Sequence, residues 1–385
     1  MLIGVIYTPP AGPFTDSLGV KQATTGDQQG FTKAVVGYIN QHGGVGGRPL
    51  QVLFAPRTAQ DSVTNLAAAE QRLCATLTED NHVLAVMSLV NSSTVLQSCL
   101  AQHRVPFVED NFGFPYMNDA ALSRYMFVPS YPDPTRAMNF FVDSLVADGF
   151  FGTHPVIGLI RAASQTRDLE DKALHGALSR HGLQVADEES ITTPDQEQGA
   201  ALHMKTNHVT HVIPLEGSGG LETLFFMEAA EGQLFRPRYA IDTQDGPDLL
   251  ASNAPSAQLK GAHGIGWIPT VDTGHTATSP ANNACLQIIR TAGLTTPDST
   301  ATRFALATCD VMFFFSQAAS GLSNWSPDGF ARAGEALGAS YTPTGSFRSF
   351  FSAARHDGTS AYGKLSYGSA CSCFAYDSAA VISTG

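Results

Sequence analysis

The feature that most constrains the fold of this chain is a regular alternation of short, β-rich apolar runs with longer amphipathic stretches. The apolar runs, which predict strands, cover residues 2–7, 50–55, 83–88 and 105–108. The amphipathic stretches, which predict helices, lie between them at about 27–41, 60–78 and 92–103. Because successive strands in such an alternation pair in parallel through right-handed helical crossovers, the first third of the chain predicts one Rossmann-like α/β unit.

The same alternation starts again after the proline-containing segment 128–134, Val-Pro-Ser-Tyr-Pro-Asp-Pro. Helical patterns and apolar runs then follow in turn at about 135–148, 155–160, 167–182, 184–188, 195–207, 209–215, 219–231 and 237–241. From about Ile265 the pattern changes to three helical stretches near 280–292, 300–320 and 326–338, a β-like run at 346–351 and a strand that contains cysteines. We therefore predict two Rossmann-like lobes with parallel sheets, and we expect the last third of the chain to complete both.

Composition and charge narrow the class of protein. A chain of 385 residues suits two domains. The formal net charge of -12, with only 22 Lys and Arg residues, provides no basic surface, so we exclude nucleic-acid partners. No apolar run reaches the roughly 20 residues that span a bilayer. Met1 leads directly into a strand-like run without signal-peptide features, so we expect the leader of a secreted form to have been removed.

A glycine-rich segment, residues 38–50 (Tyr-Ile-Asn-Gln-His-Gly-Gly-Val-Gly-Gly-Arg-Pro-Leu), separates the first predicted helix from the second strand. Glycines readily adopt the left-handed backbone that ends a helix and forms a turn. A phosphate-binding loop follows a strand and opens a helix, whereas this segment follows a helix and opens a strand. The segment therefore predicts a helix end and a turn.

This turn resembles the one that ends the first helix in type I periplasmic binding proteins of the branched-chain amino-acid receptor group. Residues 90–94 (Val-Asn-Ser-Ser-Thr) are similar to the helix start of that family that carries Ser, Ser and Thr, and residues 104–108 (Arg-Val-Pro-Phe-Val) are similar to its next strand. The motifs match over residues 1–128, whereas the second lobe is similar in architecture only. Residues 371–374 (Cys-Ser-Cys-Phe) also look like a variant found in secreted actinobacterial members.

The resemblance implies two lobes that are joined by a hinge of three chain segments, near residues 129, 265 and 345. Lobe 1 would comprise residues 1–128 with 265–345, and lobe 2 residues 129–264 with 346–385. The implied function is that of the solute-binding protein of an ABC importer, which captures a small polar ligand, amino-acid-like or carboxylate-bearing, by hinge closure. We expect a monomer without a cofactor that delivers its ligand to a membrane permease, located in the periplasm or outside the cell and attached by a lipid anchor.

Six cysteines provide a test of the cellular compartment. Their positions on neighbouring predicted elements suggest three local pairs: Cys74 with Cys99, Cys285 with Cys309, and Cys371 with Cys373. Three complete pairs favour disulfides and an oxidising compartment. The alternative is six free thiols buried as small apolar side chains.

The first candidate ligand contacts lie where the chain leaves a predicted strand and enters a helix, at Asn91, Ser92, Ser93 and Thr94. Amide and hydroxyl groups at such a helix start point to the carboxyl edge of the sheet, where they suit a ligand carboxylate. The alternative is a plain helix cap by Asn91 or Ser92, which contributes about 1 kcal/mol.

The next strand leads into Asn111, Phe112 and Gly113. Asn111 can donate and accept hydrogen bonds, and Phe112 can cover an apolar face of the ligand. The alternative for Phe112 is an aromatic cluster at the edge of the lobe.

Three strand ends of the second lobe face the cleft by the same reasoning, and they carry Arg161 and Gln165, Glu216, and Asp242. In amino-acid receptors of the family an acidic residue at the third strand end binds the ligand ammonium, and Asp242 or Asp245 would take that role. A helix cap is the alternative for Asp242. Thr166 stands where the family has an aromatic residue, which argues against an ordinary branched-chain amino acid as the ligand.

The sequence lacks the common catalytic signatures Gly-x-Ser-x-Gly, His-Glu-x-x-His and Gly-Lys-Ser/Thr. His203, His208 and His211 lack the partners of a standard zinc site, so we expect no metal there. We therefore predict a binding protein and not an enzyme. Two alternatives stay open: a cytosolic small-molecule sensor with the same fold, which would not need disulfides, and an unrecognised enzyme.

Overall fold

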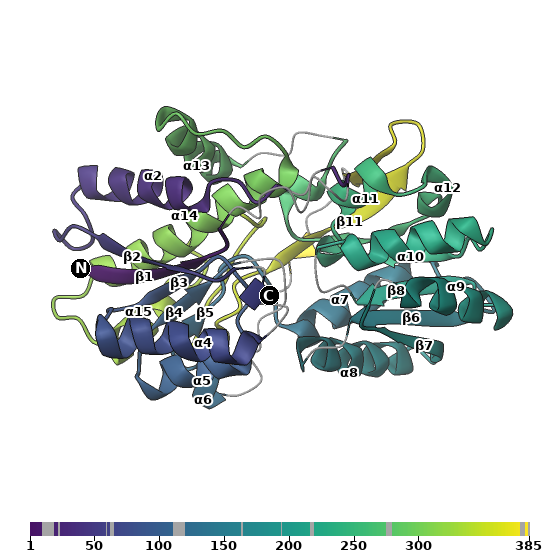
Figure 1. Cartoon of the computed structure of the whole chain (residues 1–385), viewed down its shortest axis with the longest axis horizontal. Helices are drawn as coiled ribbons and strands as arrows, with labels where there is room; N and C mark the ends of the chain where they lie inside the picture. Colours follow the sequence, from purple (N-terminus) through teal and green to yellow (C-terminus); the bar gives the residue numbers. More distant parts are fainter. Residues whose placement is uncertain are drawn as a thin grey trace.

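The computed structural model of the chain has two α/β lobes side by side along its long axis (Figure 1), which confirms the predicted fold class. The structure describes residues 1–9, 19–21, 24–58, 60–61, 65–110, 120–162, 165–193, 195–215, 219–274, 279–377 and 382–383. Each lobe is built on one sheet whose strands are mostly parallel.

The first sheet is parallel throughout and has the strand order β2-β1-β3-β4-β5. Its strands are β1 (Leu2–Tyr7), β2 (Gln51–Pro56), β3 (Val86–Ser88), β4 (Phe107–Glu109) and β5 (Met126–Phe127). One face is covered by α2 (Gln28–Gln41), α13 (Pro280–Thr291), α14 (Ser299–Ser320) and α15 (Pro327–Ala336). The other is covered by α4 (Leu66–Ala75) with the π-helical turn η1 (Thr76–Asp80), α5 (Thr94–Gln102) and α6 (Ala120–Ser123).

The burial of β1 explains why this sheet needs helices on both faces. Ile3 and Val5 pack into the core under α2 and α14, whereas Ile6 packs into the core under α4 and α5. Because side chains alternate between the faces of a strand, a continuous apolar run places hydrophobic groups on both sides of the sheet.

The second sheet has the strand order β12-β11-β10-β9-β8-β6-β7, with β13 (Ile382–Ser383) paired to β11. Its strands are β6 (Ile157–Ala162), β7 (Val185–Ile191), β8 (His211–Leu215), β9 (Arg238–Ile241), β10 (His263–Gly266), β11 (Ala361–Gly368) and β12 (Cys373–Tyr376). The helices of this lobe are α7 (Pro134–Ala147), α8 (Gln165–Arg180), α9 (Gln196–Thr206), α10 (Leu221–Gly232), α11 (Pro247–Asn253) and α12 (Ser256–Leu259), with the 3-10 turns η2 (Thr243–Asp245) and η3 (Pro269–Val271) after β9 and β10. β11 is antiparallel to both β10 and β12.

The chain passes between the lobes in three crossing segments, which we define as residues 129–133, 267–272 and 342–360. The amide of Phe347 donates to the carbonyl of Trp267 (3.1 Å), and the hydroxyl of Ser349 donates to the carbonyl of Pro129 (2.7 Å). The three segments therefore lie together. Phe351 of the third segment packs against Phe127 of the first lobe before the chain enters β11.

Two local predictions are confirmed. Disulfides join Cys74 to Cys99, Cys285 to Cys309, and Cys371 to Cys373. The glycine-rich turn ends α2, and Gly44 has a positive φ of 70°. A Cβ atom at Gly44 would lie 2.3 Å from the carbonyl oxygen of Arg48, so this turn requires glycine. Among the described residues, no helix combines the length and apolar character needed to cross a bilayer.

Candidate functional site

The carboxyl ends of both sheets meet at the crossing segments. β5 ends at Phe127, where the first crossing follows, and β10 ends at Gly266, where the second crossing follows. Because β1 to β5 are parallel and β6 to β10 are parallel, their carboxyl ends all point toward this region. Open α/β sheets place their ligand sites at such an edge.

On the first lobe, the amides at the start of α5 are satisfied by carboxyl groups of the protein itself. The amide of Ser92 donates to Glu109 (3.0 Å). The amide of Ser93 donates to Glu70 (2.9 Å), as does its hydroxyl. The amide of Leu96 also donates to Glu70 (3.3 Å). The carboxyl groups of Glu70 and Glu109 thus occupy the place that was predicted for a ligand carboxylate.

Glu70 and Glu109 are held in different electrostatic states. Glu70 is fully buried and forms an ion pair with Arg57 (3.2 Å), and Arg57 also donates to the carbonyl of Asn91. Burial raises the pKa of Glu109 to about 8, against the hydrogen bond from Ser92, which lowers it. Glu109 is therefore a neutral carboxylic acid at pH 7.

On the second lobe, Asp242 follows β9 directly and forms a capping box with Asp245. Its carboxylate accepts from the amide of Gln244 (2.6 Å), and burial raises its pKa to about 6. Arg167 lies nearby and is ion-paired with Glu170, and both side chains are buried at the start of α8. The helix-cap reading of Asp242 is therefore correct, and a cap at a strand end remains free to face a ligand.

The remaining candidate residues of the second lobe are Arg161, Gln165 and Glu216. Arg161 is ion-paired with Asp168 (2.7 Å) and with Glu188 (2.8 Å). Gln165 is the first residue of α8, and its side chain lies outside the described residues. The other candidates that lie outside the described residues are Asn111, Phe112, Gly113 and Glu216.

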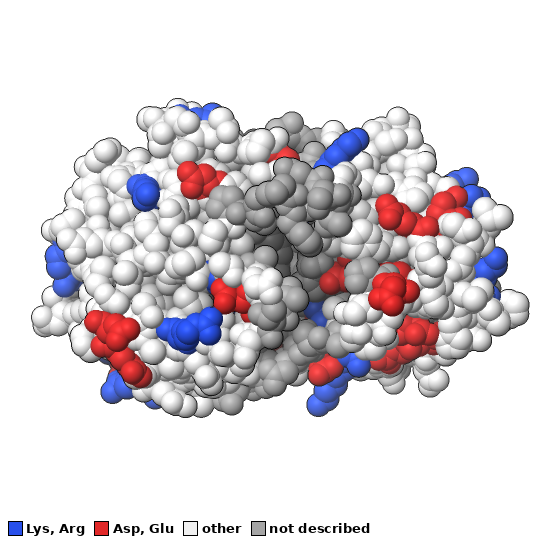
Figure 2. Space-filling view, in the orientation of Figure 1, with Lys and Arg blue, Asp and Glu red and all other residues white. Residues whose placement is uncertain are grey.

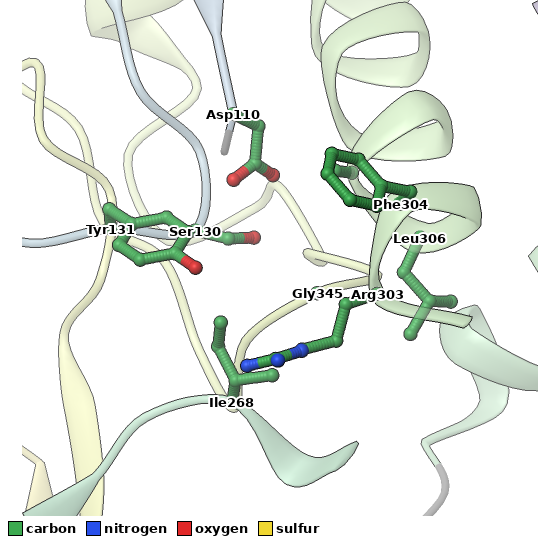
Figure 3. A pocket seen from close by; sticks show the side chains of 9 residues that line it. Asp110, Ser130, Tyr131, Ile268, Arg303, Phe304, Leu306 and Gly345 are labelled. Carbon is green, nitrogen blue, oxygen red and sulfur yellow. The ribbon is translucent and has the colours of Figure 1, made fainter. Parts of the chain in front are cut away.

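A cavity of about 300 Å³, including the space where it opens to solvent, lies where the three crossing segments meet (Figure 3). Each crossing contributes to its wall: Ser130 and Tyr131, Ile268, and Gly345. The first lobe contributes Asp110, Arg303, Phe304, Leu306 and Ala307. In Figure 3 the carboxyl of Asp110 points into the cavity from one end and Arg303 lies at the opposite end. The walls between these polar ends are largely apolar.

Asp310 on α14 connects two of the crossings to the first lobe. Its carboxylate accepts from the amides of Thr344 (2.6 Å) and Gly345 (2.7 Å), from the hydroxyl of Tyr341 (2.8 Å) and from the hydroxyl of Ser130. Asp310 is completely buried. With four donors its charge is well solvated by the protein.

Two polar contacts bridge the lobes beside this cavity. Asp248, in the first turn of α11, is ion-paired with Arg303 of α14 (3.3 Å) and accepts from the hydroxyl of Ser299. The side chain of Asn253 exchanges two hydrogen bonds with the backbone of Lys21, each 2.8 Å long. Because the Asp248–Arg303 pair is buried, removal of either partner would leave an uncompensated charge.

Two His–carboxylate groups could hold a metal ion, and they lie away from the cavity on β7, α8 and α9: Asp171, His175 and Glu188, and Asp187, Glu189 and His203. The His175 Nε2 lies 3.0 Å from Asp171. The hydrogen bond to Glu189 raises the pKa of His203. In both groups the histidine thus lies within contact distance of carboxyl side chains of the protein itself. Acidic side chains are frequent on this lobe, which lies at the right in Figure 2.

The comparisons with known proteins decide the family. The family model described as periplasmic binding protein matches residues 14–363. The chain belongs to the periplasmic binding protein family. Membership gives this periplasmic binding protein a solute-binding role and a location in the periplasm or outside the cell. No curated protein matches its sequence.

Solved structures of the same fold cover nearly the whole chain of this periplasmic binding protein. A branched-chain amino-acid ABC transporter protein of Thermus thermophilus with bound valine has a TM-score of 0.73 at 15% identity and covers 100% of this chain and 96% of its own. A substrate-binding protein of Desulfitobacterium hafniense in complex with leucine has a TM-score of 0.66 at 14% identity, covering 98% and 99%. The isoleucine complex of a Streptococcus pneumoniae transporter protein has a TM-score of 0.66 at 13% identity, covering 95% of each chain.

The cavity residues Asp110 and Arg303, and Asp310 beside Asp110, were not among the predicted site residues of this periplasmic binding protein. The sequence does carry a signal for them. Asp110 comes immediately after an apolar strand, and Asp310 lies within the apolar run Cys309-Asp310-Val311-Met312-Phe313. A charged residue in the middle of a buried pattern indicates a specific partner or a function.

Proposed function

We propose that this periplasmic binding protein is the solute-binding subunit of an ABC importer. It holds a small polar solute between lobe 1 (1–128 with 265–345) and lobe 2 (129–264 with 346–385). Rotation about the three crossing segments closes the lobes on the solute, and the closed form is recognised by a membrane permease. We further propose a monomer that is attached to the outer face of the membrane by a lipid anchor.

One observation carries this proposal, namely the cavity that all three crossing segments line. A group bound there contacts the elements that must rotate when the lobes move, so that its binding energy can favour one arrangement of the lobes. The relatives of the same fold that hold valine, leucine or isoleucine support an amino-acid-like solute. The buried Asp248–Arg303 pair supports a closed arrangement held by polar contacts across the lobes.

The solute would contact residues at the strand ends of both lobes. For lobe 1 we propose Asn91, Ser92, Ser93, Thr94, Asn111, Phe112 and Gly113. For lobe 2 we propose Arg161, Gln165, Glu216 and Asp242. The amides of Ser92 and Ser93 already donate to protein carboxyl groups. Hydrogen bonds from residues 91–94 to the solute would therefore come from the other polar atoms of this segment.

Two measurements test the proposal. Native mass spectrometry of the purified protein should show a copurified small molecule that is released unchanged, whereas conversion of that molecule would indicate an enzyme. Small-angle X-ray scattering should give a smaller radius of gyration with ligand than without it. An unchanged radius in the presence of a bound ligand would refute hinge closure. Mass spectrometry before and after reduction separates a secreted protein with three disulfides from a cytosolic sensor with reduced thiols.

A further inference from the structure

The charged groups around Tyr131 show an excess of carboxyl groups. Tyr131 is buried in the first crossing segment, and the charges of Arg303, Asp110, Asp242 and Asp248 all act on its hydroxyl. Asp310 adds a further carboxyl group beside Asp110. Four carboxyl groups thus lie near Tyr131 and Asp110 at the junction of the lobes, whereas Arg303 is the guanidinium group that acts on Tyr131.

Three of these carboxyl groups have partners that account for their burial. Asp248 is ion-paired with Arg303. Asp310 accepts four hydrogen bonds from the crossing segments and Tyr341. Asp242 accepts from the amide of Gln244, and the positive charge of Arg167 acts on it.

Asp110 differs from the other three. It is 1% exposed and lines the cavity, and its Oδ2 atom accepts no hydrogen bond from any residue that the structure describes. Its carboxyl group also interacts with the side chains of Asp310 and Ser130. A buried carboxyl oxygen without a donor is rare in folded proteins, because its desolvation is costly. The oxygen is therefore positioned for a donor that the described residues do not supply.

The rest of the cavity specifies what kind of donor fits. Tyr131, Ile268, Phe304 and Leu306 give the walls an apolar and aromatic character, which suits an alkyl chain and a cation near aromatic rings. The carboxylate of Asp310 next to Asp110 makes the local potential negative, so a positively charged donor is favoured over a neutral hydroxyl. A compact ammonium group fits a narrow cavity better than a planar guanidinium.

We propose that Asp110 binds an aliphatic ammonium group of the solute, so that the ligands of this protein are small aliphatic amines, basic amino acids included. This inference rests on the proposed solute-binding function and specifies its ligand class. The ammonium enters the cavity between Tyr131 and Phe304 and donates to Oδ2 of Asp110. Because it contacts the first crossing and α14 together, it links ligand charge to the arrangement of the lobes.

Proton release offers an independent sign of this contact. Burial and the neighbouring Asp310 raise the pKa of Asp110 well above its usual range, so the empty cavity favours the protonated form of this carboxyl group. The groups that face it are Asp310 and Arg303 from α14, Tyr131 from the first crossing and Glu109 from its own strand. An ammonium that donates to Asp110 stabilises its ionised form, so we expect amine binding to release a proton from this group to the solvent.

The experiment compares probes that differ only in the charged group. Isothermal titration calorimetry on the full chain at pH 7 uses 1-aminobutane against 1-butanol, and 1,4-diaminobutane against 1,4-butanediol. We expect the amine of each pair to bind at least about 10-fold more tightly than its neutral partner. Asp110→Asn, which matches the shape of the protonated side chain, should weaken amine binding by about 30-fold or more and leave the neutral probes unchanged.

Asp328→Asn is the matched control. Asp328 lies on α15, away from the cavity, and is ion-paired with Arg104 and Arg124. This variant should bind amines like the parent protein. If Asp110→Asn does not fold, proton release by the parent protein, from titrations in two buffers of different ionisation enthalpy, tests the contact alone. Tighter binding of neutral probes, or amine binding without proton release and with no loss in Asp110→Asn, would overturn the inference but leave solute binding intact. If no probe binds and no copurified solute is found, the proposed function fails as well.

Discussion

The buried acid Glu109 gives the sharpest test of the electrostatics at the carboxyl edge of the first sheet. Its carboxyl group is buried at the end of β4, where the amide of Ser92 donates to it. Its pKa rises from the ordinary value of 4.5 in the unfolded chain to about 8 in the folded protein. The folded state therefore binds this proton more tightly, and the stability that Glu109 contributes is complete below pH 4.5 and is lost as the pH rises toward 8.

The size of the effect follows from the pKa interval. Each pH unit between the two pKa values changes the free energy of unfolding by about 1.4 kcal/mol, so Glu109 destabilises the protein by roughly 3 to 4 kcal/mol more at pH 8 than at pH 5. Glu109→Gln keeps an acceptor for Ser92 and cannot ionise. We expect this variant to match the parent at pH 5 and to exceed its stability at pH 8 by that amount.

Urea unfolding at pH 5 and pH 8, followed by circular dichroism, measures this difference. The comparison of variant with parent cancels the contributions of the other buried acids, which titrate in both proteins. Asp80→Asn serves as the control, since Asp80 is exposed, and its effect should be the same at both pH values. If Glu109→Gln changed stability equally at pH 5 and pH 8, Glu109 would be ionised in the folded protein and the reasoning would be wrong.

Three further perturbations test contacts described above. Glu70→Ala leaves Arg57 buried without its ion pair and should lower the free energy of unfolding by about 3 to 5 kcal/mol in urea titrations; a loss below about 1 kcal/mol would contradict the role of Glu70 in holding α5. Asp248→Ala removes the buried pair with Arg303, so the unliganded protein should show a larger radius of gyration in small-angle scattering, while an unchanged radius would mean that this pair does not hold the lobes together. Ser93→Ala removes the cap that accepts from the second amide of α5 and should lower the melting temperature in line with a loss of about 1 kcal/mol; unaltered stability with weakened ligand binding would instead assign the hydroxyl to the ligand.

The alternation of strands and helices could be predicted because each element is defined locally. β1 begins and ends at the predicted residues, Leu2–Tyr7, and α13 begins at the predicted Pro280. Apolar periodicity, caps and glycine turns act within a few residues of one another, so they can be identified without knowledge of the fold. The cysteine pairs were predictable for a similar reason, since two of them connect successive helices.

The C-terminal part was harder to predict, because its strands depend on distant partners. The run at 346–351, predicted as β-like, forms an isolated bridge at Ser349. The eight-residue strand β11 was not predicted, and it pairs in antiparallel register with β10, about 100 residues earlier in the chain. Tertiary pairing, and not local pattern, decides which of two β-prone segments becomes a strand.

The candidate site likewise has a part that the local sequence predicts and a part that depends on the fold. The helix start at Asn91 to Thr94 was predicted correctly as the beginning of α5. Its amides, however, are taken by Glu70, which lies 23 residues before Ser93, and by Glu109, which lies 17 residues after Ser92. The cavity at the junction of the crossings combines residues from Asp110 to Gly345. No local pattern contains such a combination, so the fold is needed to find it.

The pairing of the cysteines determines when each disulfide can form during folding. All six cysteines are paired, and the bonds span 25, 24 and 2 residues of sequence. Partners so close in the chain meet early, because closing a short loop costs little entropy. In a polypeptide that crosses a membrane unfolded, each cysteine pair can thus form its disulfide when its own segment folds, before the two lobes are complete. Each disulfide lies within one lobe, so oxidation restricts the chain inside a lobe and adds no covalent link between the two lobes.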